Sequence, residues 1–144
     1  GAHGIKVEAD VSEEEALSML KAEGAEMVIL PGGMPGSTNL EASKLVDACI
    51  NYAIKNDKYI AAICAAPMIL GQLGLLEGKM AVCYPGFEDR LTEAAVTGNE
   101  VEQDGTVTTS QGVGTAIPFA LSLIEQLKDK NTADTIKKSI MFKH

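Results

Sequence analysis

The sequence lacks several features on which common kinds of site and partner depend. Its two histidines stand at opposite ends and its three cysteines form no CxxC pair, so no metal site is expected. It has no basic cluster, and acidic side chains outnumber basic ones by 20 to 12. Nucleic acid and anionic membrane surfaces are therefore not expected partners. No apolar run approaches the roughly 20 residues that cross a membrane.

The start of the chain and its cysteine usage bear on location. The string Gly1-Ala2-His3-Gly4 has neither the charge nor the apolar run of a signal peptide. An odd number of cysteines without regular spacing predicts free thiols in a reducing compartment rather than a disulfide framework. We therefore expect a cytoplasmic protein. Its 144 residues, 46% of them hydrophobic, are enough for one domain with a real core.

Patterns typical of strands and helices alternate along the chain. The expected strands cover 5–9, 27–30, 59–64, 79–84, 100–101 and 106–109, and the expected helices cover 12–23, 40–55, 67–74, 116–127 and a polar C-terminal segment. The helix at Ser12 opens with a capping-box pattern. The run 27–30 is continuously apolar, as in a strand buried on both faces. This alternation predicts an α/β fold with a mostly parallel sheet covered on both sides.

Cys64 is the first candidate for chemistry. It follows the apolar run 59–63, and small residues and Pro67 then open a helix, which is the strand-to-helix turn that presents a nucleophile. A helix N-terminus just beyond it would stabilise the thiolate. The alternative is a small buried hydrophobe, and that is our interpretation of Cys49. Cys83 is also assigned to packing, although the end of its strand could bring it to the same crevice.

The glycine pair Gly32-Gly33 is the second candidate. It follows the buried run 27–30, and it either only permits a turn or forms part of a binding site. Because glycine has no Cβ, both amides can approach a bound oxygen closely, and the amide of Ala65 can add another donor. Together they would form an oxyanion hole for a carbonyl attacked by the thiolate, or for an oxidised sulfur.

A base that could activate the cysteine is missing from the sequence around it. No histidine neighbours Cys64, although a nearby histidine is the usual activator of such a thiol. His3 and His144 lie near the ends, where solvent exposure is the alternative interpretation. His3 is the better candidate, because the loop before a short strand can fold over the carboxyl end of the sheet. Glu88 and Asp89 are expected to cap or to be solvated. The residues predict a nucleophile and oxyanion donors, without a triad.

Three strings of the sequence, in the same order and spacing, resemble the signatures of the ThiJ/PfpI superfamily. They are Leu-Pro-Gly-Gly at 30–33, Ala-Ile-Cys-Ala-Ala-Pro at 62–67 and Thr-Ser-Gln-Gly-Val-Gly-Thr-Ala at 109–116. They are most similar to the branch that contains the Parkinson-associated protein deglycase and bacterial ThiJ-like proteins. The resemblance implies a flavodoxin-like three-layer α/β sandwich, similar to class I glutamine amidotransferases, that forms homodimers and uses no cofactor.

The resemblance also implies site residues. It makes Cys64 the nucleophile-elbow cysteine, readily oxidised to a sulfinate. The oxyanion-stabilising positions match Gly32, Gly33 and Ala65. The residues expected to line the pocket are His3, Pro67 and Gly112.

Two departures from the family pattern stand out. In this branch a glutamate from the first βα unit hydrogen-bonds the cysteine, and Gly1 matches the segment after that unit. Residues 1–144 are therefore expected to form a single domain that lacks its first βαβ segment. The second departure is histidine. The deglycase branch often has one between the strand at 79–84 and the loop at Ser110, and none occurs between 84 and 109. The peptidase branch has one directly after the cysteine, where this chain has Ala65. Peptidase activity is therefore not expected.

Two functions from different classes follow from these observations. The first is a cysteine-dependent enzyme of the glyoxalase or deglycase type, acting on small reactive aldehydes or their adducts. The second is a non-enzymatic sensor of oxidative stress or a redox-regulated chaperone, in which oxidation of Cys64 matters more than turnover. A third interpretation is a stable but inactive fragment.

Overall fold

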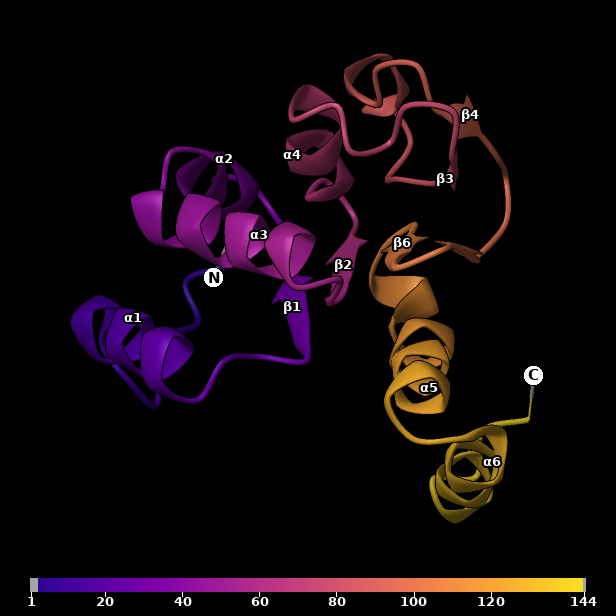
Figure 1. Cartoon of the computed structure of the whole chain (residues 1–144). Coiled ribbons are helices and arrows are strands. Elements are labelled where there is room, and N and C mark those ends of the chain that lie inside the picture. The colour runs from indigo at the N-terminus through magenta and orange to yellow at the C-terminus, as the bar shows by residue number, and fades with distance from the viewer. Residues whose placement is uncertain (1–2, 144) are drawn as a thin grey trace.

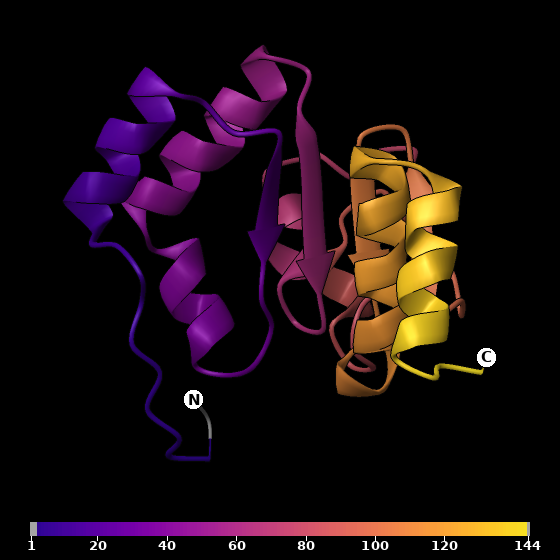
Figure 2. The ribbon, with the colours of Figure 1, turned by 90° about the horizontal axis from the view of Figure 1, so that it is seen from below.

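The computed structural model describes residues 3–143, and a four-stranded sheet lies at its centre. The strand order is β1 (Met27–Leu30), β2 (Tyr59–Ile63), β6 (Val107–Ser110) and β5 (Val101–Asp104). The first three strands are parallel, and β5 runs antiparallel to β6. Figure 2 shows the arrows of β1 and β2 pointing the same way. Two short parallel strands, β3 (Met80–Ala81) and β4 (Ala95–Val96), form a second sheet.

Helices cover both faces of the main sheet. They are α1 (Glu13–Ala22), α2 (Gly36–Glu41), α3 (Lys44–Lys55), α4 (Pro67–Gln72), α5 (Ala116–Leu127) and α6 (Lys130–Ser139), with short 3₁₀ turns η1 (Glu88–Arg90) and η2 (Val113–Thr115). In Figure 1, α3 and α4 lie on one side of the strands and α5 on the other. α6 packs against α5, and α1 against α3.

The side chains of β2 divide the core into two layers. Ile60 and Ala62 belong to the larger cluster, which α3 and α4 complete, whereas Ala61 packs against Phe119 and Leu123 of α5. Successive residues of a strand point to opposite faces, so β2 is covered on both. This arrangement confirms the expected α/β sandwich with a mostly parallel sheet.

Two expectations about strands are wrong. Residues 5–9 form no strand and are exposed, with Ile5 and Val7 at 69% and 81% exposure. Their alternation suggests a strand, but in the described residues no other strand pairs with them. The strand 27–30 is present but is not buried on both faces, because Ile29 is 51% exposed. In the described sheet β1 is the edge strand, so the α5 side packs against Met27 but leaves Ile29 exposed.

Other elements differ from expectation only in their bounds. The helix expected over 40–55 is divided into α2 and α3, because Ser43 starts a new helix and its hydroxyl accepts a hydrogen bond from the amide of Val46. The strand expected over 79–84 keeps its ladder only at 80–81, and β4 was not expected. The helix over 116–127 is as expected.

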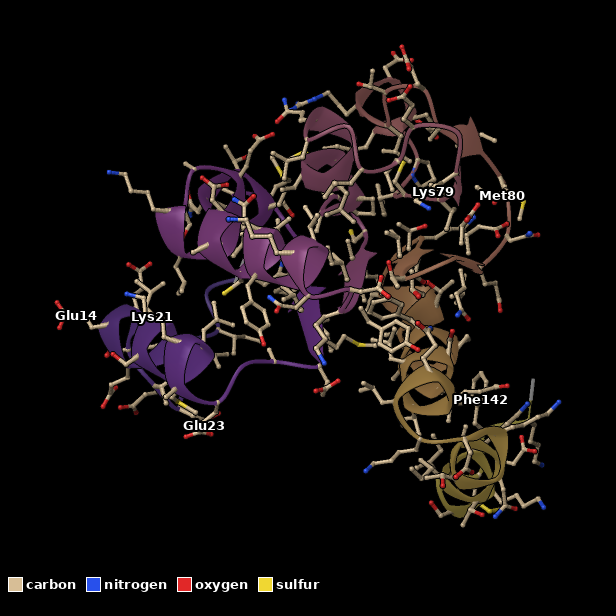
Figure 3. The ribbon with its side chains drawn as sticks, viewed as in Figure 1. Glu14, Lys21, Glu23, Lys79, Met80 and Phe142 are labelled. Carbon is tan, nitrogen blue, oxygen red and sulfur yellow. The ribbon has the colours of Figure 1, made fainter. Side chains whose placement is uncertain are left out.

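α1 is the least embedded of these helices. Its capping box is confirmed: the Ser12 amide donates to Glu15 Oε2 at 2.8 Å, and the Glu15 amide donates to Ser12 Oγ at 3.3 Å. None of its residues is buried, and Figure 3 shows Glu14, Lys21 and Glu23 around it at the margin of the fold. Within the described residues, no helix has the length and apolar character needed to cross a membrane.

Gly71, inside α4, provides a test of how closely that helix packs against residues 90–91. Helix propensity alone predicts that Gly71→Ala stabilises the protein by about 0.5–1 kcal/mol. We expect the opposite sign, because an added Cβ would lie 2.2 Å from the Arg90 carbonyl oxygen and 2.8 Å from Leu91 Cα. Overpacking of this kind costs about 1–3 kcal/mol. Thermal unfolding would measure it. Gly36→Ala, in α2 with open space around it, is the control, and a stabilised Gly71→Ala would contradict this packing.

Candidate active site

Cys64 occupies a sharp turn between β2 and α4. Its φ is +67°, a left-handed conformation that residues other than glycine seldom adopt. Its amide donates to the Ser110 carbonyl at 2.9 Å, and its own carbonyl accepts from the Tyr84 amide at 2.8 Å. Its side chain is partly exposed. The turn therefore has the strand-to-helix geometry that presents a nucleophile at the carboxyl end of a central strand.

Gly32 lies directly against Cys64. A Cβ added at Gly32 would be 2.4 Å from Cys64 Cβ, 2.7 Å from the Ile63 carbonyl oxygen and 3.2 Å from Cys64 Sγ. Any larger side chain would have to displace the cysteine or the loop. A glycine is needed at position 32 because the backbone there lies so close to Cys64. Two loops that are distant in the sequence therefore meet at the thiol.

Both loops contain backbone amides that donate no hydrogen bond among the described residues. They include those of Gly32, Gly33 and Ala65, and Ala65 is only 2% exposed. Buried amides are almost always paired, and an unpaired one costs about 1–3 kcal/mol. Gly33 has φ +92°, which orients its amide in a way that most residues cannot. Unpaired amides in loops beside a thiol are suited to bind a negatively charged oxygen.

A third loop, residues 110–115, completes the surroundings of Cys64. Ser110 pairs with Ile63 in the sheet, and its hydroxyl lies 2.6 Å from that of Thr115. Thr115 Oγ1 accepts from the Gly112 amide at 3.0 Å, which fixes the loop. A Cβ added at Gly112 would lie 3.3 Å from the ring of Tyr84. The glycine therefore gives the tyrosine ring room beside the site.

The residues expected to line the pocket divide into three cases. Gly112 is buried beside Tyr84 in the loop that adjoins Cys64. Pro67 is fully buried at the first position of α4, so it supports the turn and is not open to a ligand. His3 is exposed in the N-terminal stretch, and no hydrogen bond or ion pair joins it to the site within residues 3–143. His144 lies outside the described residues.

Cys83 is the residue whose position the sequence left open, and it lies beside Cys64. It is 4% exposed, and burial raises the pKa of its thiol to about 11, helped by the negative charges of Glu88 and of the Cys64 thiolate. Glu88 itself is exposed and accepts a hydrogen bond from the Gly86 amide at 2.7 Å. Burial also raises the pKa of Cys49. Cys83 is therefore both a core residue and a neighbour of the candidate nucleophile.

Tyr84 is the neighbour that sequence reasoning missed. It supplies the amide that binds the Cys64 carbonyl, and its ring is half exposed over Gly112. The string Tyr-Pro-Gly directly after the expected strand 79–84 marks a loop at a strand end, and this was the available signal. Asp89, like Glu88, is exposed, which agrees with the expectation that these two residues cap or are solvated.

The described residues contain no cluster of His, Cys, Asp and Glu that could hold a metal ion. A cavity of about 460 Å³ lies between α1 and α3, lined in part by Leu17, Leu20 and Tyr52, and contains none of the candidate site residues. The chemistry available around Cys64 is thus that of a thiol, unpaired amides and a second thiol. Such a set suits addition to a carbonyl or oxidation of sulfur.

A central parallel strand that ends in a left-handed cysteine, flanked by a glycine loop, defines a class of α/β proteins built around a nucleophile elbow. Residues 1–126 match the DJ-1/PfpI family, and the chain belongs to that family. It is similar to Protein DJ-1 homolog A of Arabidopsis thaliana (38% identity over 98% of this chain) and to the Glutathione-independent glyoxalase DJR-1.2 of Caenorhabditis elegans (30% over 96%). Among solved structures it is similar to oxidized Toxoplasma gondii DJ-1, with a TM-score of 0.88 and 34% identity over 99% of this chain.

These relatives are longer than the chain. It spans 36% of the length of the Arabidopsis protein, 73% of the Caenorhabditis protein and 76% of the Toxoplasma chain. The family match over residues 1–126 establishes membership, and the structural similarity establishes the flavodoxin-like fold. The activity of a whole protein of this kind is a matter for proposal.

Gly32→Ala tests the contact between the glycine loop and the thiol. The added Cβ would overlap the Cys64 side chain, so we expect a stability loss of about 1–3 kcal/mol and an altered rate of Cys64 alkylation. Thermal unfolding and iodoacetamide kinetics would measure both. Gly98→Ala, where a Cβ meets no atom within 4 Å, should change neither. Wild-type stability and alkylation in Gly32→Ala would show that the two loops are not in contact.

The thiols should differ in their dependence on pH. Near pH 8 only about one Cys83 thiol in a thousand is ionised if its pKa is about 11, so iodoacetamide should label Cys64 well before Cys83. Labelling of Cys83 should then rise about tenfold per pH unit up to that pKa. Peptide mass spectrometry would follow each site, with urea-unfolded protein as the control in which all three label alike. Equal labelling of both thiols near pH 8 in the folded protein would contradict the burial of Cys83.

Proposed function

We propose that this protein is a cysteine-dependent enzyme of the glyoxalase or deglycase type, acting on small reactive aldehydes or their adducts. One observation carries the proposal: the partly exposed Cys64 at a left-handed turn is adjoined by loops whose amides, at Gly33 and Ala65, have no partner among the described residues. A nucleophile beside unpaired donors is the arrangement that addition to a carbonyl requires.

The proposed reaction begins with addition of the Cys64 thiolate to the aldehyde carbon. A carbon–sulfur bond forms, and the carbonyl oxygen takes the negative charge, which the amides of Gly33 and Ala65 stabilise. The product is a hemithioacetal. For a 2-oxoaldehyde, the hydrogen of that carbon moves as a proton to the neighbouring carbonyl carbon, and the hydroxyl proton of the adduct moves to that carbonyl's oxygen, which gives a 2-hydroxy thioester. Water then releases a 2-hydroxy acid and regenerates the thiol.

The proton transfer requires a base close to the adduct. Cys83 cannot serve near neutral pH, because its pKa of about 11 keeps it protonated. In the branch that the sequence resembles, a glutamate of the first βα unit hydrogen-bonds the cysteine, and a carboxylate in that position would suit the transfer. The name of the Caenorhabditis relative, a glutathione-independent glyoxalase, supports an activity of this class.

A redox role is the second candidate function, and one observation favours it. Cys83, a second thiol, lies beside Cys64 and is buried, which a turnover enzyme of this type does not need. The homodimer implied by the resemblance stays a prediction, which the molar mass of the protein in solution would test.

The enzyme proposal is tested by turnover of methylglyoxal by the complete natural protein. Cys64→Ser should reduce kcat/KM by at least about 10³-fold, because it removes the nucleophile. Cys49→Ser should leave the rate near that of wild type, since Cys49 lies on α3 away from the site. Formation of lactate would be followed with time. Equal activity in Cys64→Ser and wild type would overturn the proposal.

A further inference from the structure

The backbone holds Cys64 and Cys83 side by side. The Tyr84 amide donates to the Cys64 carbonyl oxygen at 2.8 Å, and Cys83 directly precedes Tyr84. This hydrogen bond makes the two backbone segments neighbours, one at the left-handed turn of Cys64 and the other shortly after β3. Disulfide-bonded cysteines have Cα atoms about 4.4–6.8 Å apart. A disulfide between Cys64 and Cys83 needs a separation in that range, and the Tyr84 hydrogen bond brings their backbones together although 19 positions separate them in the sequence.

The electrostatics of the two thiols agree with this placement. A negative charge on Cys64 raises the pKa of Cys83, in addition to the larger effects of burial and of Glu88. Such an interaction between thiolates is felt only at short range, because solvent and counterions screen distant charges. No comparable effect links Cys49 to either thiol.

The two thiols differ in access to an oxidant. Cys64 is partly exposed at the turn, whereas Cys83 is 4% exposed and belongs to the larger core cluster. A peroxide in solution therefore meets Cys64 first. Cys83 can be oxidised only through Cys64 while the protein stays folded.

We propose that Cys83 is the resolving thiol of Cys64, so that oxidation by a peroxide ends in an internal Cys64–Cys83 disulfide. This inference rests on the proposed function, because it requires Cys64 to be the reactive thiol. It adds a partner residue that the aldehyde reaction does not use.

The chemistry consists of two balanced steps. In the first, the Cys64 thiolate attacks one oxygen of hydrogen peroxide, the O–O bond breaks, and Cys64 sulfenic acid and hydroxide form. In the second, the Cys83 thiol gives up its proton and attacks the Cys64 sulfur; the S–S bond forms, and the sulfenic oxygen leaves as water. The peroxide is the two-electron oxidant, and both sulfurs end in the disulfide.

The first step prepares the second. While Cys64 is a thiolate, its charge helps to keep the Cys83 thiol protonated. Conversion to a neutral sulfenic acid removes that charge, so the pKa of Cys83 falls and its thiolate fraction rises at the moment when a nucleophile is needed. The resolving thiol thus becomes more reactive after oxidation, although burial, the larger cause, still raises its pKa. The disulfide would also protect Cys64 from irreversible addition of further oxygen.

The test treats the wild-type chain and Cys83→Ala with about one equivalent of peroxide, followed by alkylation and non-reducing peptide mass spectrometry. In wild type we expect a peptide pair linked through Cys64 and Cys83, with the loss of two hydrogens. In Cys83→Ala we expect at least about tenfold more Cys64 sulfinate, because no thiol intercepts the sulfenic acid. Cys49→Ser is the matched control and should behave as wild type.

Each other outcome is decisive. Equal amounts of Cys64 sulfinate in wild type and Cys83→Ala, without a linked pair, would overturn the resolving role while leaving Cys64 reactive. An unmodified Cys64 in both proteins would overturn the proposed function and this inference with it. Linkage of Cys64 to Cys49, or between two chains, would also overturn the inference. If Cys83→Ala does not fold, the presence or absence of the linked pair in wild type decides the question.

Discussion

The left-handed backbone of Cys64 is the constraint on which the surroundings of the site depend. This conformation costs an L-residue roughly 1–2 kcal/mol, and neighbouring segments maintain it. The amide of Cys64 is bound by Ser110 and its carbonyl by Tyr84, while Gly32 leaves room for its side chain. Three segments thus converge on one turn. Each is tied to the backbone or packed against the side chain of the cysteine, so the thiol is positioned by the fold and not by its own loop.

Small side chains in and after β2 make that convergence possible. Ala61 and Ala62 in the strand, and Ala65 and Ala66 after it, are between 0 and 2% exposed. Because they occupy little volume, the helices and loops around them approach closely, and the interior remains densely packed. α4 is packed equally closely at Gly71, where the absence of a side chain lets the backbone of residues 90–91 lie against the helix. The site is therefore built on a closely packed part of the core.

The sequence predicts individual helices and caps better than it predicts which segments lie beside one another. The helix over 116–127 and the capping box at Ser12 follow from short-range patterns. The strand expected over 5–9 fails because alternation shows only which residues could form a strand, and pairing needs another segment. Ile29 is exposed because β1 lies at the edge of the described sheet, and the order of strands cannot be deduced from the apolar run 27–30 alone. The contact between Cys64 and Cys83 rests on a hydrogen bond from Tyr84, which no local pattern encodes.

The titration of the second thiol separates the two candidate functions. An aldehyde enzyme needs a base that is deprotonated near neutral pH, and Cys83, with a pKa of about 11, cannot provide one. A redox partner needs the reverse: a thiol that stays protonated and shielded until its neighbour is oxidised. Both proposals start from the described residues around Cys64, adduct formation from the thiol and its amides and disulfide formation from the second thiol. Catalytic turnover, by contrast, needs a proton acceptor other than these residues. The aldehyde reaction therefore depends on a base that disulfide formation does not use, and disulfide formation depends on Cys83, which the aldehyde reaction does not use.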